Sequence, residues 1–194
     1  MSNLTHYLEF TVLPNSEISQ SILMNQLFDR VHLAIVASGT SIGLSFPGYQ
    51  AGQEGRIGLG CCLRAFGCEH ALLRFREHLM VRALDGYLTV SETKAVPGNC
   101  RHISFMRRQS KGWPSARSRF ARRNTLDRSM KDSIYLTGVK RTIDGLPYVR
   151  YFSRSTQNHM MLFIARGLPQ DQAVEGTFTR FGLSRGGATV PEFD

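Results

Sequence analysis

The chain has 194 residues, 42% of them hydrophobic, and a formal net charge of +9 from 24 Lys and Arg against 15 Asp and Glu. This length fits one large domain or two small ones, and the hydrophobic content is enough for a real core. No stretch approaches the ~18 apolar residues that span a membrane. The N-terminus lacks the basic-then-apolar pattern of a signal peptide, so we expect a cytoplasmic protein without membrane contact.

The spacing of the four cysteines matches no common disulfide or metal-binding pattern. Cys61 and Cys62 are adjacent, whereas Cys68 and Cys100 stand apart, which fits neither a disulfide-rich fold nor a paired C-x₂-C zinc site. Cys62, Cys68 and His70 form at most a partial ligand set, and buried free thiols explain the cysteines better. We therefore expect no metal ion and no other cofactor.

The first half of the chain predicts the element order β-α-β-β-α-β. Alternating apolar residues predict a half-buried strand over 6–13. A helix follows, from a Ser19 cap to about residue 37, where Gly39 ends it. The other expected elements are strands at 42–46, 56–63 and 87–96 and a helix at 69–79. This order is typical of the ferredoxin-like fold, which by itself indicates no particular function.

The composition changes after Pro97-Gly98. The elements expected beyond this point are a helix from Trp113-Pro114-Ser115, a helix at 129–137, strands at 148–152, 160–165 and 177–183, and a flexible turn at 184–187. The sequence therefore predicts an α+β protein with two domains. Residues 1–97 form a ferredoxin-like βαββαβ domain, and residues 98–194 carry an arginine-rich helix and a small antiparallel sheet.

A basic segment between residues 101 and 128 holds nearly all of the excess positive charge. Its one acid is Asp127, and its nine cations are Arg101, Arg107, Arg108, Lys111, Arg117, Arg119, Arg122, Arg123 and Arg128. Such a concentration of charge repels itself unless a polyanion neutralises it, and phosphate backbones do so with counterion release as the driving force. The alternative is a solvated or disordered basic loop.

Two details favour nucleic acid over a solvated loop. On the first expected helix of this half, Arg119, Arg122 and Arg123 share one face. Just upstream, Arg107 and Gln109 are one residue apart in a segment that suits an extended backbone, which sends both side chains the same way. Arginine can form two hydrogen bonds with guanine, and glutamine can form two with adenine. Base-reading side chains therefore lie next to the helix arginines that would hold phosphates.

Several short segments, none distinctive alone, occur together in a fixed order over nearly the full length. They are His6-Tyr7-Leu8, residues 27–32, residues 42–47, residues 153–159, residues 162–164 and residues 177–187. In this order and spacing the chain resembles the CRISPR repeat-processing endoribonucleases of type I-F systems, the Csy4 type of the Cas6 superfamily.

The resemblance implies an enzyme that binds the stem-loop of a CRISPR repeat RNA and cuts at the 3′ base of the stem to make mature crRNA. The cut needs no metal: the ribose 2′-OH attacks, leaving a 2′,3′-cyclic phosphate and a 5′-OH. The hairpin product stays bound as part of a crRNA-guided, Cascade-type surveillance complex in antiviral defence. The implied partners are the repeat RNA and other type I-F subunits, with target DNA met only indirectly.

The resemblance also implies roles for particular residues. The family's catalytic histidine matches His32, and the serine that holds the attacking ribose matches Ser153. A nearby serine and threonine of the family's active site match Ser155 and Thr156. The helix that enters the RNA major groove and the base-reading pair before it match these residues: Arg119, Arg122, Arg123, Arg107 and Gln109.

Two positions depart from the family's pattern. Where the family stacks an aromatic residue under the terminal base pair, this chain has Met160, which packs but does not stack. The family's active-site tyrosine matches Phe181, so the hydroxyl is absent. These departures support an alternative, a non-catalytic RNA hairpin-binding subunit of such a complex. A more distant rival is a basic DNA-binding or ribosome-associated module of ferredoxin-like fold.

Taken without the resemblance, the same residues have ordinary explanations. A lone helical histidine such as His32 is usually structural or solvated, and the hydroxyls at 153–156 suit a turn between two strands. His159 is not distinguishable from a surface histidine and stays outside the catalytic set. Imidazole, with an ordinary pKa near 6.5, exchanges protons near neutral pH as the reaction requires. Whether His32 acts as the base or the acid stays open at this point.

Overall fold

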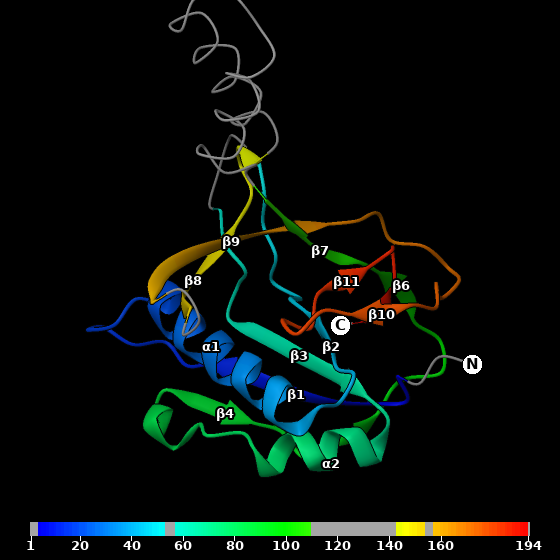
Figure 1. The fold of residues 1–194 in the computed structure, drawn as a ribbon, viewed down its shortest axis with the longest axis horizontal. Coiled ribbons are helices and arrows are strands. Elements are labelled where there is room, and N and C mark those ends of the chain that lie inside the picture. Colours follow the sequence, from blue (N-terminus) through cyan, green and yellow to red (C-terminus); the bar gives the residue numbers. More distant parts are fainter. Residues whose placement is uncertain (1–3, 53–56, 110–142, 154–156, 194) are drawn as a thin grey trace, which may run out of the picture.

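The computed structural model describes residues 4–52, 57–109, 143–153 and 157–193 (Figure 1). This part of the chain is a mixed α+β structure with few helices and several mostly antiparallel sheets. The arginine-rich helix and the helix expected at 129–137 lie outside the described residues. Within the described residues, no helix is long and apolar enough to cross a membrane.

The first sheet has the strand order β2-β3-β1-β4, with every neighbouring pair antiparallel. Its strands are β1 (His6–Val12), β2 (Gly43–Ser45), β3 (Cys62–Gly67), β4 (Leu88–Val90) and the short β5 (Lys94–Ala95), which pairs with the start of β1. The alternating pattern that predicted β1 is confirmed, because Leu8, Phe10 and Val12 are all buried. One face of this central strand therefore packs entirely in the core.

Two α-helices and a 3₁₀ turn accompany this sheet: α1 (Gln20–Ser38), α2 (Glu69–Glu77) and η1 (Arg82–Leu84). The predicted end of α1 is confirmed, since Gly39 is left-handed (φ 63°) and its amide donates to the Ile35 carbonyl. Ser19 occupies the N-cap position, but its side chain makes no capping hydrogen bond. Asn15 Oδ1 instead accepts from the backbone amides just ahead of the helix.

The two faces of β1 meet different parts of the chain. On one face Phe10 packs edge-on against Phe75 of α2, with ring centroids 6.5 Å apart. On the other face Tyr7 contacts Phe193 near the C-terminus at 5.0 Å. One hydrophobic core therefore includes side chains from both predicted domains, and the division at residue 97 stays a prediction.

A second sheet has the order β10-β11-β7-β9-β8, and β6 and β12 form a separate pair. The bounds are β6 (Arg101–Ile103), β7 (Phe105–Arg108), β8 (Tyr148–Ser153), β9 (Asn158–Arg166), β10 (Thr177–Phe178), β11 (Ser184–Arg185) and β12 (Val190–Glu192). Figure 1 shows α1 lying between the first sheet and the β8 edge of the second. This helix therefore joins the two sheets at the predicted catalytic residue.

Three predicted strands differ from the structure. The strand expected at 56–63 is β3, displaced to Cys62–Gly67, because the glycine-rich residues before it supply few side chains to bury. The strand expected at 87–96 is divided into β4 and β5. The strand expected at 177–183 ends at Phe178, because Thr179 Oγ1 accepts from the amides of Phe181 and Leu183 and closes a turn.

Gly182 completes that turn. Its φ of 68° is left-handed, and a Cβ there would collide with the Leu44 side chain. Its carbonyl accepts a hydrogen bond of 2.8 Å from the Leu44 amide on β2. The flexible turn expected at 184–187 is also wrong in its first half, because Ser184–Arg185 is strand β11 and Ser184 is buried.

Candidate active site

His32 lies on α1 with its ring half-buried beside the turn between β10 and β11. Its Nδ1 is 2.7 Å from the backbone carbonyl oxygen of Arg180. Because a carbonyl only accepts hydrogen bonds, the proton of this contact is on Nδ1. The other ring nitrogen, Nε2, then carries the lone pair of the neutral imidazole. The backbone at residue 180 therefore selects the tautomer that can take up a proton at Nε2.

Phe181 holds the plane of the histidine ring. It stacks on His32 with centroids 4.2 Å apart and an interplanar angle of 19°. The fully buried Phe28 also lies nearly parallel to Phe181, with ring centroids 6.3 Å apart. Phe28 and His32 are one helical turn apart, so α1 supplies both rings that lie parallel to Phe181. The structure therefore brings together two predicted site residues that are 149 positions apart in the chain.

Tyr151 on β8 is a member of this cluster that the sequence analysis missed. Its ring meets Phe181 edge-on at 5.0 Å and His32 at 6.2 Å. The only signal in the sequence is its place two residues before Ser153, because alternate residues of a strand share a face. Tyr151 forms the second aromatic wall beside the imidazole.

The register of the β8–β9 hairpin places Ser153 and Met160 on the same face as Tyr151. Tyr151 pairs with Met160, and Ser153 pairs with Asn158. Ser153 thus lies roughly 7 Å along the strand from Tyr151. A hydrogen bond of 3.0 Å from the Arg150 amide to Asn25 Oδ1 of α1 ties the strand to the helix that carries His32.

Arg107 on β7 reaches the same cluster from the other side. Its guanidinium carbon lies 5.7 Å from the centroid of the Phe181 ring. Its Nε is buried without a hydrogen-bond partner within the described part of the chain, and such an unpaired donor is costly. Gln109 follows immediately after β7 and is exposed. A cationic side chain with unused donor capacity therefore borders the imidazole site.

The remaining predicted residues are not part of this geometry. Ser155, Thr156 and the helix arginines Arg119, Arg122 and Arg123 lie outside the described residues, so their roles stay predictions. His159, which the sequence analysis left out of the catalytic set, pairs with Phe152 and lies on the opposite face of the hairpin from Ser153.

The cysteines form no site in the described residues, which contain no group of three or more His, Cys, Asp or Glu side chains placed to hold a metal ion. All four thiols are free, but Cys61 is exposed and the others are half-buried, so the expectation of buried thiols is only partly right. Burial raises the pKa of Cys62 to about 12, and the charge of Glu9 adds to the effect.

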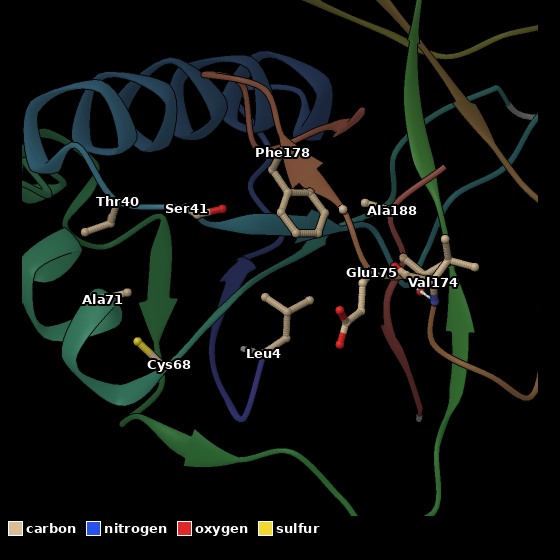
Figure 2. Close-up of a pocket in the computed structure, with 11 residues that line it drawn as sticks. Leu4, Thr40, Ser41, Cys68, Ala71, Val174, Glu175, Phe178 and Ala188 are labelled. Atoms are coloured by element: carbon tan, nitrogen blue, oxygen red, sulfur yellow. Dashed lines mark hydrogen bonds between the residues drawn. The ribbon is translucent and has the colours of Figure 1, made fainter. Parts of the chain in front are cut away.

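A separate cavity of about 340 Å³ lies between the C-terminal end of α1, the start of α2 and the segment around Phe178 (Figure 2). The Glu175 carboxylate and the Cys68 thiol line it together with apolar side chains. None of the predicted site residues lies in this cavity. It is therefore distinct from the cluster around His32.

Nearly the whole of this chain matches a protein family. The model described as CRISPR-associated protein (Cas_Csy4) matches residues 7–193. The chain belongs to the Cas_Csy4 family. A Pseudomonas aeruginosa (strain UCBPP-PA14) relative, named CRISPR-associated endonuclease Cas6/Csy4, is 36% identical over 97% of this chain and 99% of its own length. An Escherichia coli (strain UTI89 / UPEC) relative of the same name is 31% identical over the same shares.

Membership of the Cas_Csy4 family confirms the resemblance recognised in the sequence. His32, Tyr151, Ser153 and Phe181 all fall inside the matched span. The cluster around His32 is therefore the candidate active site of a Cas_Csy4 protein.

Proposed function

We propose that this protein is an endoribonuclease that cuts CRISPR repeat RNA at the 3′ base of its stem-loop. The observation that carries the proposal is the His32 geometry. Its Nδ1 is bound to the Arg180 carbonyl, its ring is stacked on Phe181, and its Nε2 is left to exchange a proton. The relatives named CRISPR-associated endonucleases support the same reaction class.

His32 acts as the general base in this proposal. Nε2 removes the proton of the ribose 2′-OH, the 2′-oxygen attacks the adjacent phosphorus, and the bond from phosphorus to the 5′-oxygen breaks. The leaving 5′-oxygen takes a proton from water, so the products are a 2′,3′-cyclic phosphate and a 5′-hydroxyl. The Arg180 carbonyl stabilises the imidazolium that forms, because Nδ1 keeps its proton and its hydrogen bond throughout.

Ser153 orients the ribose for in-line attack. Alignment of this kind lowers a barrier by several kcal/mol, on the order of the effects seen in intramolecular reactions. The resemblance to the family assigns Ser155 and Thr156 supporting roles in the active site. Phe181 acts through its ring alone, by holding the imidazole plane. Every step uses proton transfer and positioning by this chain's own residues, and the proposal needs no metal ion.

Recognition of the stem-loop belongs to the basic residues. Arg107 and Gln109 read the last base pairs of the stem, and the unused Nε of Arg107 beside the site supports this role. Arg119, Arg122 and Arg123 hold the stem from its major groove. That groove is deep and narrow in A-form RNA, so a helix enters it only where the stem ends or is distorted. A short hairpin meets this condition, and Met160 then packs below its terminal pair.

We further propose that the protein has two domains and acts as part of a larger assembly. A ferredoxin-like N-terminal domain over 1–97 is supported by the strand order β2-β3-β1-β4 and by α1 and α2 packing with that sheet. Residues 98–194 form the RNA-binding domain. The protein stays on its hairpin product in the cytoplasm, as one subunit of a type I-F crRNA-guided complex.

The deciding experiment is a denaturing gel of cognate repeat RNA incubated with the protein and EDTA. A matched RNA carries a 2′-deoxy nucleotide before the predicted cut. Cleavage of the first RNA and not of the second is expected. Cleavage of both, or cleavage that EDTA abolishes, contradicts the mechanism.

The base role of His32 has its own test. A repeat RNA with sulfur in place of the bridging 5′-oxygen has a leaving group that needs no proton. If His32 is the base, His32→Ala stays inactive on this RNA. Restored cleavage by the variant would assign His32 to the acid role instead.

The second candidate is a non-catalytic hairpin-binding subunit, favoured by Phe181 and Met160. Tight binding of the repeat hairpin without cleavage on the same gel identifies it. Competition between the repeat hairpin and duplex DNA separates both candidates from a DNA-binding module.

A further inference from the structure

The face of the β8–β9 hairpin that points away from His32 carries a row of exposed aromatic and apolar side chains. Tyr148 pairs with Phe163, and Phe152 pairs with His159. These residues alternate with Val149, Tyr151 and Ser153, so they project from the opposite side of the strands. Tyr148 is 41% exposed, Phe152 43% and Met161 47%. Large exposed apolar groups gathered on one face are typical of a binding surface.

The rings of this face are already arranged in pairs. Tyr148 and Phe163 lie 5.5 Å apart, and Phe152 and His159 lie 5.3 Å apart. Each pair spans the two strands, so the rings are held by the hairpin register. The rings within each pair are inclined to each other by 54° and 63°, and exposed rings that are already held in place bind planar groups with little loss of side-chain freedom.

Positive charge accompanies the rings. The Arg150 guanidinium lies 5.8 Å from the Tyr148 ring centroid. The exposed Arg108 of β7 pairs with Phe163 and therefore projects from the same face. Strands β7, β8 and β9 contain no Asp or Glu. Aromatic rings interleaved with arginines stack unpaired bases and neutralise the phosphates between them.

We propose that this face, defined by Tyr148, Arg150, Phe152, Met161 and Arg108, binds the single-stranded RNA that continues 3′ from the cut. The inference rests on the proposed function, which places Ser153 at the ribose of the scissile phosphate. Phe152 is the next residue back along the strand and projects to the other face. β8 is the edge strand of the described sheet (Figure 1), and α1 contacts it at Arg150 through Asn25. An RNA strand leaving Ser153, three residues beyond that contact, can therefore pass around the edge onto Phe152.

Unpaired RNA is the occupant that this chemistry favours. Paired bases inside a stem already stack on one another and offer no free face to a ring. A flanking strand offers one free face per base, and base-aromatic stacking tolerates any sequence. The face therefore recognises that a strand continues past the cut, and it distinguishes uncut precursor from hairpin product.

The test compares affinities of the full-length protein for RNAs that it does not cut. The repeat hairpin is used with a 2′-deoxy nucleotide before the cut and either no extension, an unpaired 3′ extension or an equally long 5′ extension. The 3′ extension is expected to tighten binding at least about fivefold, the effect of stacking one base. The 5′ extension is expected to leave the affinity unchanged.

Variants assign the gain to this face. Phe152→Leu keeps the apolar bulk without the ring, and Arg150→Gln removes the charge. Each is expected to reduce the gain from the 3′ extension to less than about twofold while leaving the affinity for the bare hairpin unchanged. Leu73→Ala and Arg74→Gln, at exposed positions on α2, are the matched controls and should keep the full gain.

Three results overturn the inference: no gain from the 3′ extension, an equal gain from the 5′ extension, or a gain that survives both Phe152→Leu and Arg150→Gln. A gain that survives both substitutions would mean that this face does not bind the RNA extension and would favour a protein partner for it. Affinity for the bare hairpin reports on the fold of each variant. Failure of the wild-type protein to bind that hairpin contradicts the proposed function itself, so the two failures are distinguishable.

Discussion

Arg64 and Arg107 lie on strands around the same core but in opposite circumstances. Arg64 is 8% exposed and engaged through two of its nitrogens, with its Nε donating to Glu9 Oε2 at 2.6 Å and its Nη1 donating to the Phe193 carbonyl. Its guanidinium also lies over the Phe193 ring. Arg107 has a buried Nε without a partner in the described residues, beside the imidazole site. Arg64 holds the C-terminal segment against β3, and the unpaired donor of Arg107 borders the candidate active site.

This contrast shows that the number of charged residues in a basic protein does not indicate which of them form a functional site. Both arginines contribute equally to the net charge. Their hydrogen bonds distinguish them, because Arg64 is paired within the fold and Arg107 Nε has no partner in the described residues. The His32–Arg107 region is therefore expected to govern catalysis and RNA affinity, and the Arg64 region to govern the free energy of unfolding.

The largest expected effect tests the catalytic region. His32→Ala removes the proton acceptor, so the single-turnover cleavage rate falls by roughly 10²–10⁴-fold. Repeat-RNA affinity changes by less than about 1 kcal/mol, because the lost contact acts in the transition state. Single-turnover kinetics and filter binding measure the two quantities. His70→Ala, at an exposed position on α2, is the matched control, and retained cleavage by His32→Ala would refute the mechanism.

The second-largest expected effect is the loss of stability when Arg64 is replaced. Arg64→Met keeps the apolar stem but leaves Glu9 and the Phe193 carbonyl without their donor. The free energy of unfolding in urea is expected to fall by about 3 kcal/mol, with the cleavage rate of the folded enzyme unchanged. The double variant Arg64→Met with Glu9→Gln should recover part of the loss, since the unpaired carboxylate is removed. A variant as stable as wild type would show that the Arg64 contacts do not stabilise the fold.

The same substitution at the unengaged arginine should do the reverse. Arg107→Met is expected to weaken repeat-RNA binding by about 1–3 kcal/mol, the value of one bidentate base contact. Its free energy of unfolding should not fall, because the substitution removes a buried donor that has no partner. Urea unfolding and filter binding on one preparation give both numbers. Destabilisation comparable to that of Arg64→Met would show that Arg107 is structural.

A smaller effect is expected from the ring that supports His32. Phe181→Leu removes the stack on the imidazole, which is worth about 0.5–1.5 kcal/mol for an aromatic pair. The cleavage rate should fall severalfold with KM little changed, because ring orientation matters most in the transition state. Phe181→Tyr keeps the stack and is the control that should retain the wild-type rate or exceed it. An equal loss in both variants would place the effect elsewhere.

The smallest expected effect is a difference in cysteine reactivity, which measures how well the region around Arg64 excludes solvent. Burial and the Glu9 charge raise the pKa of Cys62 to about 12, so its thiol stays protonated until the pH approaches that value. At pH 8 iodoacetamide should therefore modify Cys62 at least about tenfold more slowly than its exposed neighbour Cys61. Peptide mapping by mass spectrometry measures both rates in one sample. Equal rates would mean that this side of β1 is open to solvent.

Local patterns predicted the elements whose signals are complete within a few residues. β1 follows from strict alternation of buried residues, and α1 ends where Gly39 accepts a left-handed backbone. The segment after Phe178 was predicted wrongly as a strand. Its turn depends on hydrogen bonds to the Thr179 hydroxyl and on the close approach of Gly182 to Leu44. No periodicity in the sequence reports such contacts.

Membership of the Cas_Csy4 family, which is read from the sequence, gives the reaction class, and the sequence also points to the candidates His32, Ser153 and Phe181. The packing of Phe181 and Tyr151 around the imidazole, and the contact with the Arg180 carbonyl that sets its tautomer, are visible only in the folded chain. These contacts join α1 to strands more than a hundred residues away in the chain. Such pairs depend on how the sheets pack, whereas sequence patterns record only the propensities of neighbouring residues.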